Sequence, residues 1–345
     1  METNVGSPVS QAADVPSPAR LSQLITGFRI TQAIYVAATL GIADLLAIAP
    51  RPVEEVARVT GTHAPSLDRL LLMLASIGLF IQDADGRFCN TALSEHLRDD
   101  HPHSMRGLAL MYGAPWTWTP WGALDETIKT GRPAFDRLYG RPMFEHLAQN
   151  ASDAAIYNKA MSSTSARDLP GILDAYDFSG FDCIVDVGGG HGALLQAILA
   201  RHPGPRGVLA DQAPVLANAP LTHGSLARRC TAVPIDFFEA VPADADCYVL
   251  KQIVHDWNDQ DALRILRNVR SAIRPDGRLL LIDIVLKARN EPDPGRGLDM
   301  HMLVTLKGRE RTAAEVEVLL DQAGFAQTRV IPTAGLPSIV ESRPA

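Results

Sequence analysis

From Asp182 onward, short apolar runs alternate with stretches whose apolar residues recur at helical spacing. The runs cover 182–187, 206–211, 231–236, 246–254 and 277–286, and the helical stretches include 193–201 and 260–273. Strands that alternate with helices in this way predict a doubly wound α/β sheet. A helix over 312–323, capped by Thr312, precedes two apolar segments, 327–331 and 339–340, which we expect to close the sheet as a hairpin.

The first hundred residues show a helical rhythm instead. Apolar residues at helical spacing predict a helix over 21–40, and Gly41 separates it from a short helix that runs through Leu46. Segments 52–60, 64–77 and 78–90 then predict helix, helix and hairpin, the order of a winged helix-turn-helix unit. Because the first two helices are apolar on most sides, they indicate an interface between two copies of the chain, with ordinary packing inside one chain as the alternative.

These patterns divide the chain into four parts. We expect a disordered tail over 1–19, a winged-helix domain over 20–100, a helical region that lines the substrate over 101–177, and an α/β domain over 178–345. The third part holds a cluster of aromatic and methionine residues suited either to contact a flat apolar ligand or to fill a core. These are Met111, Tyr112, Trp116, Trp118, Trp121, Phe135, Tyr139, Phe144, Tyr157 and Met161.

Composition and charge narrow the functional classes. The 345 residues are 46% hydrophobic and 21% charged, and the net charge is -7, which argues against binding nucleic acid. The predicted recognition helix offers one arginine, Arg69, and the wing offers only Arg87, whereas a DNA-reading helix needs several polar side chains. A ligand-sensing winged-helix regulator stays as the non-enzyme alternative.

Other features suggest where the protein works. The N-terminal residues lack a basic start followed by an apolar core, and the longest apolar stretch, 33–49, is shorter than the about 20 residues of a membrane span. The four cysteines show no C-x-x-C spacing. We therefore expect a cytoplasmic protein with no membrane partner.

The segment DVGGGHG, residues 186–192, predicts a strand that ends in a glycine turn and leads into a helix, the geometry of a nucleotide site. Gly188, Gly190 and Ala193 fit the pattern of dinucleotide enzymes, with Asp211 placed to hold a ribose. The same run, beginning at Asp186, also looks like the first motif of S-adenosylmethionine (SAM)-dependent methyltransferases. The glycines alone do not decide between these cofactors.

Each later strand also ends in polar residues, at the edge where open α/β sheets bind ligands. These are Asp211, Asp236, then Lys251 with His255 and Asp256, and finally Asp283.

The segment LKQIVHDWND, residues 250–259, closely resembles the LHDW motif of the plant caffeate and flavonoid O-methyltransferases and of their bacterial relatives that methylate polyketides and phenazines. DVGGGHG resembles their SAM loop, YNKAM (157–161) their substrate-helix motif, and GRERT (308–312) their GGKERT. Order and spacing agree over about 20–342. The resemblance implies a Rossmann-like SAM-methyltransferase domain preceded by a winged-helix dimerisation domain.

What the resemblance implies for function is a homodimeric, metal-independent O-methyltransferase that acts on a hydroxyl of an aromatic small molecule. His255 would be the general base, because a positioned imidazole can take the proton of a phenol whose pKa is about 10. Asp283 and Glu310 would flank the imidazole and fix its orientation, although the plant enzymes have glutamate where Asp283 stands. Carried onto matching positions, cofactor contacts would come from Gly188, Asp211, Asp236, Phe237 and Lys251, and acceptor contacts from Met161, Met302 and Asp256.

Two other enzyme classes remain as alternatives. One is an NAD(P)-dependent oxidoreductase that uses Gly188, Gly190 and Asp211. The other is a family member that uses the same fold for hydroxylation or decarboxylation of aromatic substrates. The presence of His255 favours methyl transfer over these reactions. The acidic run HDWNDQD has Asp261 where a calcium loop requires glycine, so we expect no metal. His255 could also merely cap a helix beside Asp256.

Overall fold

The computed structural model describes residues 17–217, 219 and 226–345, and the chain divides between Ser94 and Glu95 into two compact units. Most of the predicted N-terminal tail, residues 1–16, lies outside the described residues. The prediction that the tail reaches residue 19 is wrong, because helix α1 already begins at Pro18. The side chain of Ser17 caps it by accepting a hydrogen bond from the backbone N–H of Arg20. The other two predicted boundaries, after residues 100 and 177, stay predictions.

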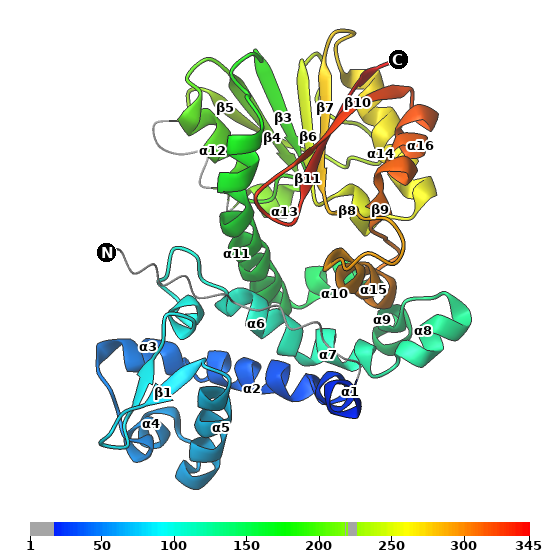
Figure 1. Cartoon of the computed structure of the whole chain (residues 1–345). Helices are drawn as coiled ribbons and strands as arrows, with labels where there is room; N and C mark the ends of the chain where they lie inside the picture. The colour runs from blue at the N-terminus through cyan, green and yellow to red at the C-terminus, as the bar shows by residue number, and fades with distance from the viewer. Residues whose placement is uncertain (1–16, 218, 220–225) are drawn as a thin grey trace, which may run out of the picture. The chain divides into compact units, whose positions relative to one another are not determined.

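The first unit has the predicted winged-helix order (Figure 1). Its elements are α1 (Pro18–Ile25), α2 (Phe28–Thr39), α3 (Ile42–Ile48), α4 (Val53–Thr60), α5 (Ala64–Ser76), β1 (Phe80–Gln82) and β2 (Phe88–Asn90). The strands pair as an antiparallel hairpin. The single helix expected over 21–40 is interrupted at Thr26, whose hydroxyl donates to the carbonyl oxygen of Ser22 and which ends α1.

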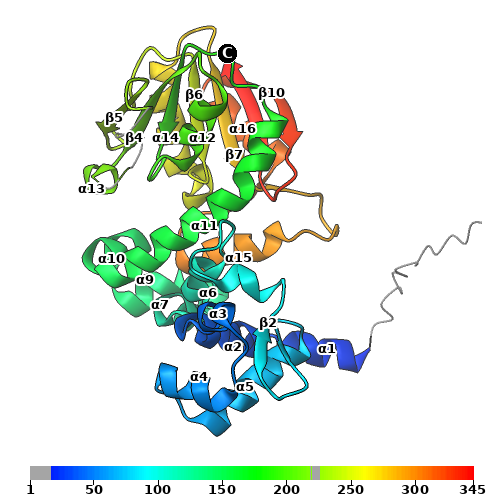
Figure 2. The same cartoon turned by 90° about the vertical axis from the view of Figure 1, so that its left-hand side faces the viewer.

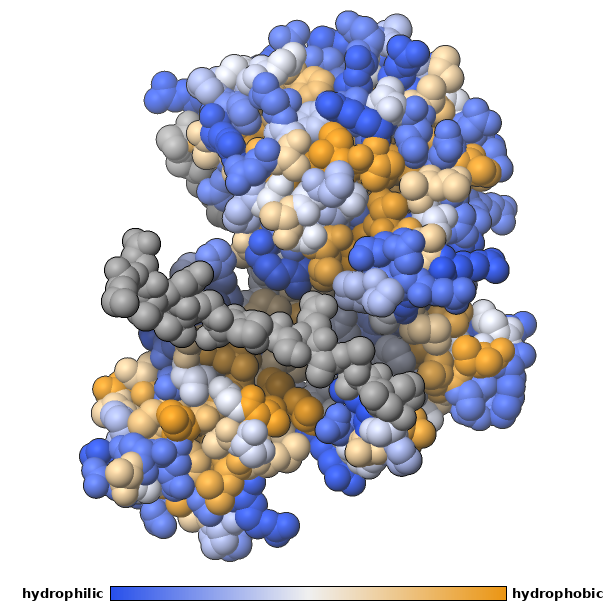
Figure 3. All heavy atoms as spheres, viewed as in Figure 1, coloured by the Kyte–Doolittle hydropathy of each residue, from blue (hydrophilic) through white to orange (hydrophobic). Residues whose placement is uncertain are grey.

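Apolar side chains remain exposed on the first two helices. No residue of α1 is buried, and Leu21, Leu24, Ile25 and Phe28 are each more than half exposed. Figure 3 shows apolar residues gathered on the surface of this unit. Within the described residues, no single helix has the length and hydropathy to cross a membrane, and only α1–α2 taken together with α3, a pair bent by 57°, meets those criteria.

The second unit begins with helices and continues as a sheet. A short 3-10 helix, η1 (Ser94–Leu97), contains the point of division. The helices that follow it are α6 (Arg106–Gly113), α7 (Pro115–Trp121), α8 (Leu124–Thr130), α9 (Ala134–Tyr139), α10 (Met143–Gln149) and α11 (Ala151–Ala175). The longest, α11, packs along α6 and then against α12 (Ala193–Arg201). It therefore belongs both to the helical region and to the sheet domain.

In the described part of the chain, the sheet has seven strands in the order β10-β11-β7-β6-β3-β4-β5. Their bounds are β3 (Cys183–Val187), β4 (Arg206–Asp211), β5 (Cys230–Pro234), β6 (Cys247–Lys251), β7 (Arg278–Asp283), β10 (Phe325–Pro332) and β11 (Ser338–Pro344). β3 to β7 are parallel, and β11 joins β7 antiparallel, so that the predicted C-terminal hairpin lies at one edge and β5 at the other (Figure 2). The strand order reverses between β3 and β6, which is where such sheets bind ligands.

Helices cover both faces of this sheet, as expected for a doubly wound fold. Alternate residues of β3 show why, since Val185 and Val187 pack with α14 (Asp259–Ala272) and α16 (Ala313–Gln322), while Ile184 packs with α11 and α12. Thr312 caps α16 as predicted, in a reciprocal capping box with Glu315. The remaining elements are α13 (Ala213–Leu216), η3 (Val254–Asp256), β8 (Val285–Leu286), α15 (Gly295–Thr305) and β9 (Arg311–Thr312).

Candidate active site

The glycine turn after β3 leaves backbone exposed where a side chain would not fit. Gly188 has a φ of 67°, and a Cβ there would lie 2.5 Å from Cδ1 of Ile253. The carboxylate of Asp211, at the end of β4, accepts a hydrogen bond of 2.8 Å from the backbone N–H of Gly190. Beneath the turn, Asp186 is buried, and its Oδ2 has no hydrogen-bond partner among the described residues.

The other residues predicted to hold the cofactor follow neighbouring strands at the same edge. Asp236 and Phe237 come directly after β5, and the Phe237 ring lies 3.7 Å from where a Cβ of Gly188 would be. Lys251 ends β6, and its ammonium donates to the hydroxyl of Ser165 on α11 at 3.1 Å. Burial lowers the pKa of Lys251. The structure therefore brings the five predicted cofactor residues to one edge of the sheet.

The histidine follows a tight turn rather than a strand. The prediction that the fourth strand reaches residue 254 is wrong, because β6 ends at Lys251 and Gln252 has a φ of 55°. The short 3-10 helix η3 then carries His255 and Asp256. A Cβ on Gly308 would collide with the carbonyl oxygen of His255, and the next residue, Arg309, donates its backbone N–H to that same oxygen at 2.8 Å.

Arg311 fixes this turn from below. Its buried guanidinium donates to the carbonyl oxygens of Val254 and Trp257, at 3.0 and 2.9 Å, and to the carboxylate of Asp259. These bonds hold the backbone on both sides of His255. The GRERT segment therefore supplies Gly308, which allows the backbone of this segment to approach the turn closely, and Arg311, which holds the turn by hydrogen bonds. It also supplies the acid between them.

That acid, Glu310, contacts the histidine directly. Oε1 of Glu310 lies 2.7 Å from Nδ1 of His255, and the Glu310 side chain is fully buried. On the other side of the ring, Oδ1 of Asp256 lies 3.4 Å from Nε2. Oδ1 of Asp283 has no hydrogen-bond partner in the described structure, and the negative charge of this residue contributes to raising the pKa of His255. That Asp283 also fixes the orientation of the ring stays a prediction.

The electrostatics of this cluster favour a charged imidazole. Burial alone would lower the pKa of His255, but the negative charges of Asp256 and Glu310 outweigh burial and raise it to about 10. Burial raises the pKa of Asp256 to about 7 and that of Asp283 to about 6. The cluster thus stabilises a proton on the imidazole, as carboxylates beside a catalytic histidine do.

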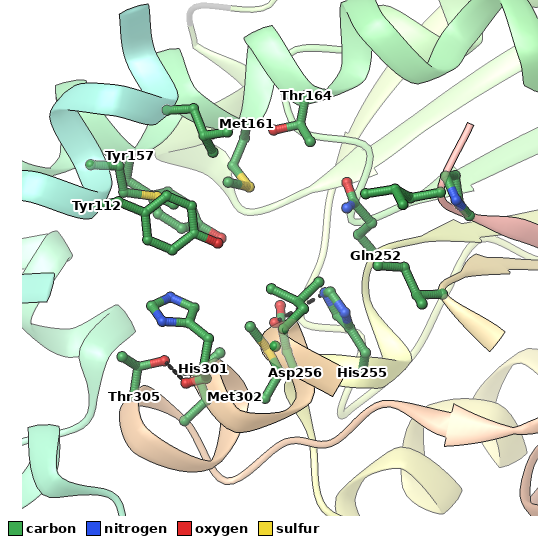
Figure 4. Close-up of a pocket in the computed structure, with 18 of the residues that line it drawn as sticks. Tyr112, Tyr157, Met161, Thr164, Gln252, His255, Asp256, His301, Met302 and Thr305 are labelled. Atoms are coloured by element: carbon green, nitrogen blue, oxygen red, sulfur yellow. Dashed lines mark hydrogen bonds and ion pairs between the residues drawn. The ribbon is translucent and has the colours of Figure 1, made fainter. Parts of the chain in front are cut away.

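A cavity of about 280 Å³ opens in front of His255 (Figure 4). Its walls come mainly from one face each of three helices: Leu108, Met111 and Tyr112 of α6, Tyr157, Met161, Thr164 and Asp168 of α11, and Leu298, His301, Met302 and Thr305 of α15. Asp256 and Gln252 also line it. All three predicted acceptor residues, Met161, Met302 and Asp256, therefore face the cavity together with His255.

The residues of the aromatic cluster are divided between the wall of the cavity and the core. Trp116, Tyr112 and Tyr157 line the cavity, whereas Phe135 packs on Tyr139 with ring centroids 4.5 Å apart and is fully buried. Trp121 has a third role, since its indole N–H donates to His301.

Several cavity residues were not predicted to belong to the site, among them Arg167, Asp168, Gln252 and His301. A signal for some of them exists, because helical spacing of four, three and four connects Tyr157, Met161, Thr164 and Asp168 on one face of α11. On α15, Leu298 is three and four residues before His301 and Met302, and Thr305 is four and three residues after them, so these four also share one helix face.

Within the residues the structure describes, no group of three or more His, Cys, Asp or Glu side chains is arranged to hold a metal.

A Rossmann-like sheet with a glycine turn, next to a buried histidine–carboxylate pair that faces an apolar cavity, defines a nucleotide-dependent enzyme for a flat organic substrate. Family comparison identifies which one. The family model of the O-methyltransferase domain matches residues 121–326, and that of the O-methyltransferase dimerisation domain matches residues 22–100. The chain belongs to the O-methyltransferase family.

Individual relatives agree along nearly the whole chain. The phenazine O-methyltransferase PhzM of Lysobacter antibioticus is 44% identical over 337 residues, which are 97% of this chain and 98% of that protein. The crystal structure of LaPhzM superposes with a TM-score of 0.92 at 44% identity, over 96% of this chain and 100% of that one. The O-methyltransferase NcsB1 of neocarzinostatin biosynthesis, in complex with SAM and 2-hydroxy-5-methyl naphthoic acid, gives 0.82 at 34% identity, over 97% and 100%. The resemblance and fold class expected from the sequence are confirmed, and the oxidoreductase and regulator alternatives are not favoured.

Proposed function

We propose that this enzyme is a SAM-dependent O-methyltransferase that transfers a methyl group to a hydroxyl of an aromatic small molecule, with His255 as the general base. One observation carries the proposal: the imidazole is held by Glu310 at 2.7 Å and faces an apolar cavity. The family and the relatives named above support both the reaction and the aromatic class of acceptor.

The edge of the sheet fits the cofactor. In this proposal Gly188 would contact the methionine end, Asp211 the ribose hydroxyls, Asp236 and Phe237 the adenine, and Lys251 the cofactor's backbone region. Their position at one edge of the sheet supports these roles. When bound, SAM supplies an electrophilic methyl group on a sulfonium.

The residues of this chain would then act on the acceptor. The methionine and leucine walls hold the aromatic ring and exclude water, so that the hydroxyl is positioned, and positioning accounts for much of the catalysis. Nε2 of His255 takes the hydroxyl proton while Nδ1–H donates to Glu310. The charges of Glu310, Asp256 and Asp283 stabilise the imidazolium that forms.

The dimerisation domain leads to a finer proposal, a homodimer that forms through the first two helices. The exposed side chains of Leu21, Leu24, Ile25 and Phe28 support it, since such an apolar face on a helix requires a partner surface. A cytoplasmic location, and the lack of nucleic-acid and membrane partners, stay predictions.

The first test is binding and turnover of the purified protein. Calorimetric titration should show tight binding of S-adenosylhomocysteine and none of NADPH. Replacing His255 by Ala should leave that binding intact and lower turnover on phenolic acceptors by about 10²-fold or more. His103→Ala, a change at an exposed histidine, is the matched control and should turn over at the wild-type rate. NADPH binding without S-adenosylhomocysteine binding, or an unaffected His255→Ala, would refute the proposal.

A further inference from the structure

The cavity contains a second histidine that the reaction described above does not use. His301 lies on α15 across the cavity from His255, beneath the ring of Tyr112 (Figure 4). Its ring centroid is 5.1 Å from that of Tyr112, and the residue is 7% exposed. Burying a polar ring costs free energy unless its nitrogens form hydrogen bonds. The hydrogen-bond partner of each ring nitrogen of His301 therefore has to be identified.

One nitrogen has a partner that fixes the chemistry of the other. The indole Nε1–H of Trp121 donates to Nδ1 of His301 at 3.2 Å. Because an indole nitrogen can only donate, Nδ1 must be the unprotonated nitrogen. In a neutral imidazole the proton then resides on Nε2, which has no hydrogen-bond partner within the described residues and belongs to a side chain that lines the cavity.

The charge of this ring differs from that of His255. Burial, together with the nearby positive charge of His255, lowers the pKa of His301 to about 4. At neutral pH the ring is therefore uncharged and keeps the tautomer that Trp121 selects. His301 thus offers one preoriented N–H donor in a part of the cavity wall where the other polar side chains are those of Tyr112 and Thr305.

We propose that the Nε2–H of His301 donates a hydrogen bond to an uncharged acceptor atom of the substrate, a carbonyl oxygen or an aromatic ring nitrogen, and so selects among aromatic hydroxy compounds. The proposal rests on the methyltransferase function stated above. It means that the substrate is bound at two points, its hydroxyl at His255 and its second polar atom at His301.

An uncharged atom fits this donor better than a carboxylate. A carboxylate in a dry cavity needs a cation, and a neutral imidazole does not supply one. The guanidinium that lines the same cavity, Arg167, already forms two hydrogen bonds with the carboxylate of Asp168, at 2.8 and 3.2 Å. The donor on His301 is therefore left to recognise a neutral acceptor.

The test compares acceptors that differ by one atom. Naphthols and hydroxyquinolines or hydroxyisoquinolines of the same shape differ in a ring C–H replaced by N, and 8-hydroxyquinoline is omitted because it chelates metals. For each pair, kcat/KM for methylation is measured with the wild type, His301→Phe, Trp121→Phe and Met143→Leu. For each enzyme, the kcat/KM of the nitrogen compound is divided by that of the naphthol of the same shape, which cancels effects that act on both compounds. Comparing this ratio between wild type and variants then cancels the difference in intrinsic reactivity of the two compounds.

We expect the wild type to prefer at least one nitrogen compound by about tenfold, the effect of one good hydrogen bond. His301→Phe keeps an aromatic ring but has no hydrogen-bond donor. It should lose this preference, so that the kcat/KM ratio falls to the ratio of the intrinsic reactivities of the two compounds. Trp121→Phe, which frees the tautomer, should lower it in part. Met143→Leu changes the shape of the cavity wall without touching a hydrogen bond, and should leave the ratio unchanged.

Other outcomes would overturn the proposal. A wild-type ratio that His301→Phe does not change, or that Met143→Leu lowers equally, shows that His301 does not recognise the ring nitrogen. If hydroxynaphthoic acids depend on His301 and hydroxyquinolines do not, the bound group is a carboxylate. Failure of the wild type to methylate any compound, despite binding S-adenosylhomocysteine, contradicts the proposed function instead.

Discussion

His255 differs from an ordinary surface histidine because three carboxylates act on it in a buried setting. Their charges raise its pKa to about 10, although burial alone would lower it. A base of raised pKa is a better proton acceptor when neutral, but it is neutral in fewer molecules at pH 7. The activity of the enzyme should therefore depend on pH in the alkaline range.

We predict that kcat/KM for an acceptor with a pKa of about 10 rises by about tenfold per pH unit from pH 7 toward the pKa of His255. The imidazole must lose one proton before it can take the proton of the hydroxyl, and the loss of one proton gives this slope. In Glu310→Gln one of the charges that raise the pKa of His255 is removed, so this rising limb should move to lower pH while the maximal rate falls. Initial rates measured from about pH 6 to about 10.5 at a saturating concentration of SAM give both the position of the rising limb and the maximal rate.

The matched control is Glu317→Gln on the exposed face of α16, which should keep the wild-type profile. The contrary outcome is a rising limb of the pH profile that stays in place in Glu310→Gln but shifts with acceptors of different pKa. It would show that His255 does not determine the pH dependence.

At this scale the sequence could identify residues but not their geometry. His255 and Glu310 could be named from motifs, and they lie in hydrogen-bond contact. The looser position of Asp283 and the inclusion of His301 could not be foreseen, because both depend on which face of a strand end or helix meets the cavity. That choice is made by packing between segments far apart in the chain.

Among the elements, the short helix η3 and the segment 308–312 act as one unit, although about fifty residues separate them. Gly308 is the closest point of contact. We predict that Gly308→Ala displaces the His255 turn, because a methyl group there would overlap a backbone carbonyl. Methylation should fall by about tenfold or more, given how steeply rates depend on position.

Calorimetry with S-adenosylhomocysteine should show nearly wild-type affinity for this variant, since the cofactor edge is built by other segments. Gly180→Ala is the control, because a Cβ at Gly180 has no atom within 4 Å, and its activity should be normal. Equal losses in both variants would mean that the contact at Gly308 is unimportant.

Two arginines of the same segment allow a comparison of buried and exposed charge. The side chain of Arg311 is 4% exposed and donates to three carbonyl oxygens, whereas that of Arg309 is 43% exposed and pairs only with carboxylates. Arg311→Met should lower the free energy of unfolding by about 2 to 4 kcal/mol, because buried carbonyls lose their donors. Arg309→Met should change it by less than about 1 kcal/mol.

Thermal unfolding of the two variants beside the wild type measures this difference as a shift in Tm. Comparable Tm values for Arg309→Met and Arg311→Met would contradict the role assigned to the buried side chain.

Prediction of the elements from the sequence succeeded where local signals were strong. Helix α12 has the expected bounds, Ala193–Arg201, because a glycine turn begins it and an apolar stripe continues to its end. β6 was overestimated because Ile253 and Val254 continue the apolar run, and only the left-handed backbone of Gln252 ends the strand. Glutamine carries no signal for that conformation.

For the whole molecule, the family's dimerisation domain and the exposed face of α1 and α2 predict assembly into a dimer. The double variant Leu24→Glu and Phe28→Glu places two charges on that face and should give a monomer in light scattering after size exclusion. Val318→Glu, a change at a 57% exposed residue of α16, is the control and should remain dimeric.

A shortened chain that begins after Pro50, and so lacks α1, α2 and α3, should likewise lose its dimer or its solubility. If the truncated chain folds well and remains dimeric, the interface lies elsewhere.

The acceptor cavity is formed by faces of α6, α11 and α15, while the proposed cofactor residues stand at strand ends. Substitutions on the cavity face of α15, at Leu298, His301 or Met302, can therefore change the substrate without disturbing the methyl donor. Duplicated copies of such a gene can diverge toward new acceptors in single steps, each of which retains a working cofactor site. A fold arranged in this way suits biosynthetic pathways whose products diversify quickly.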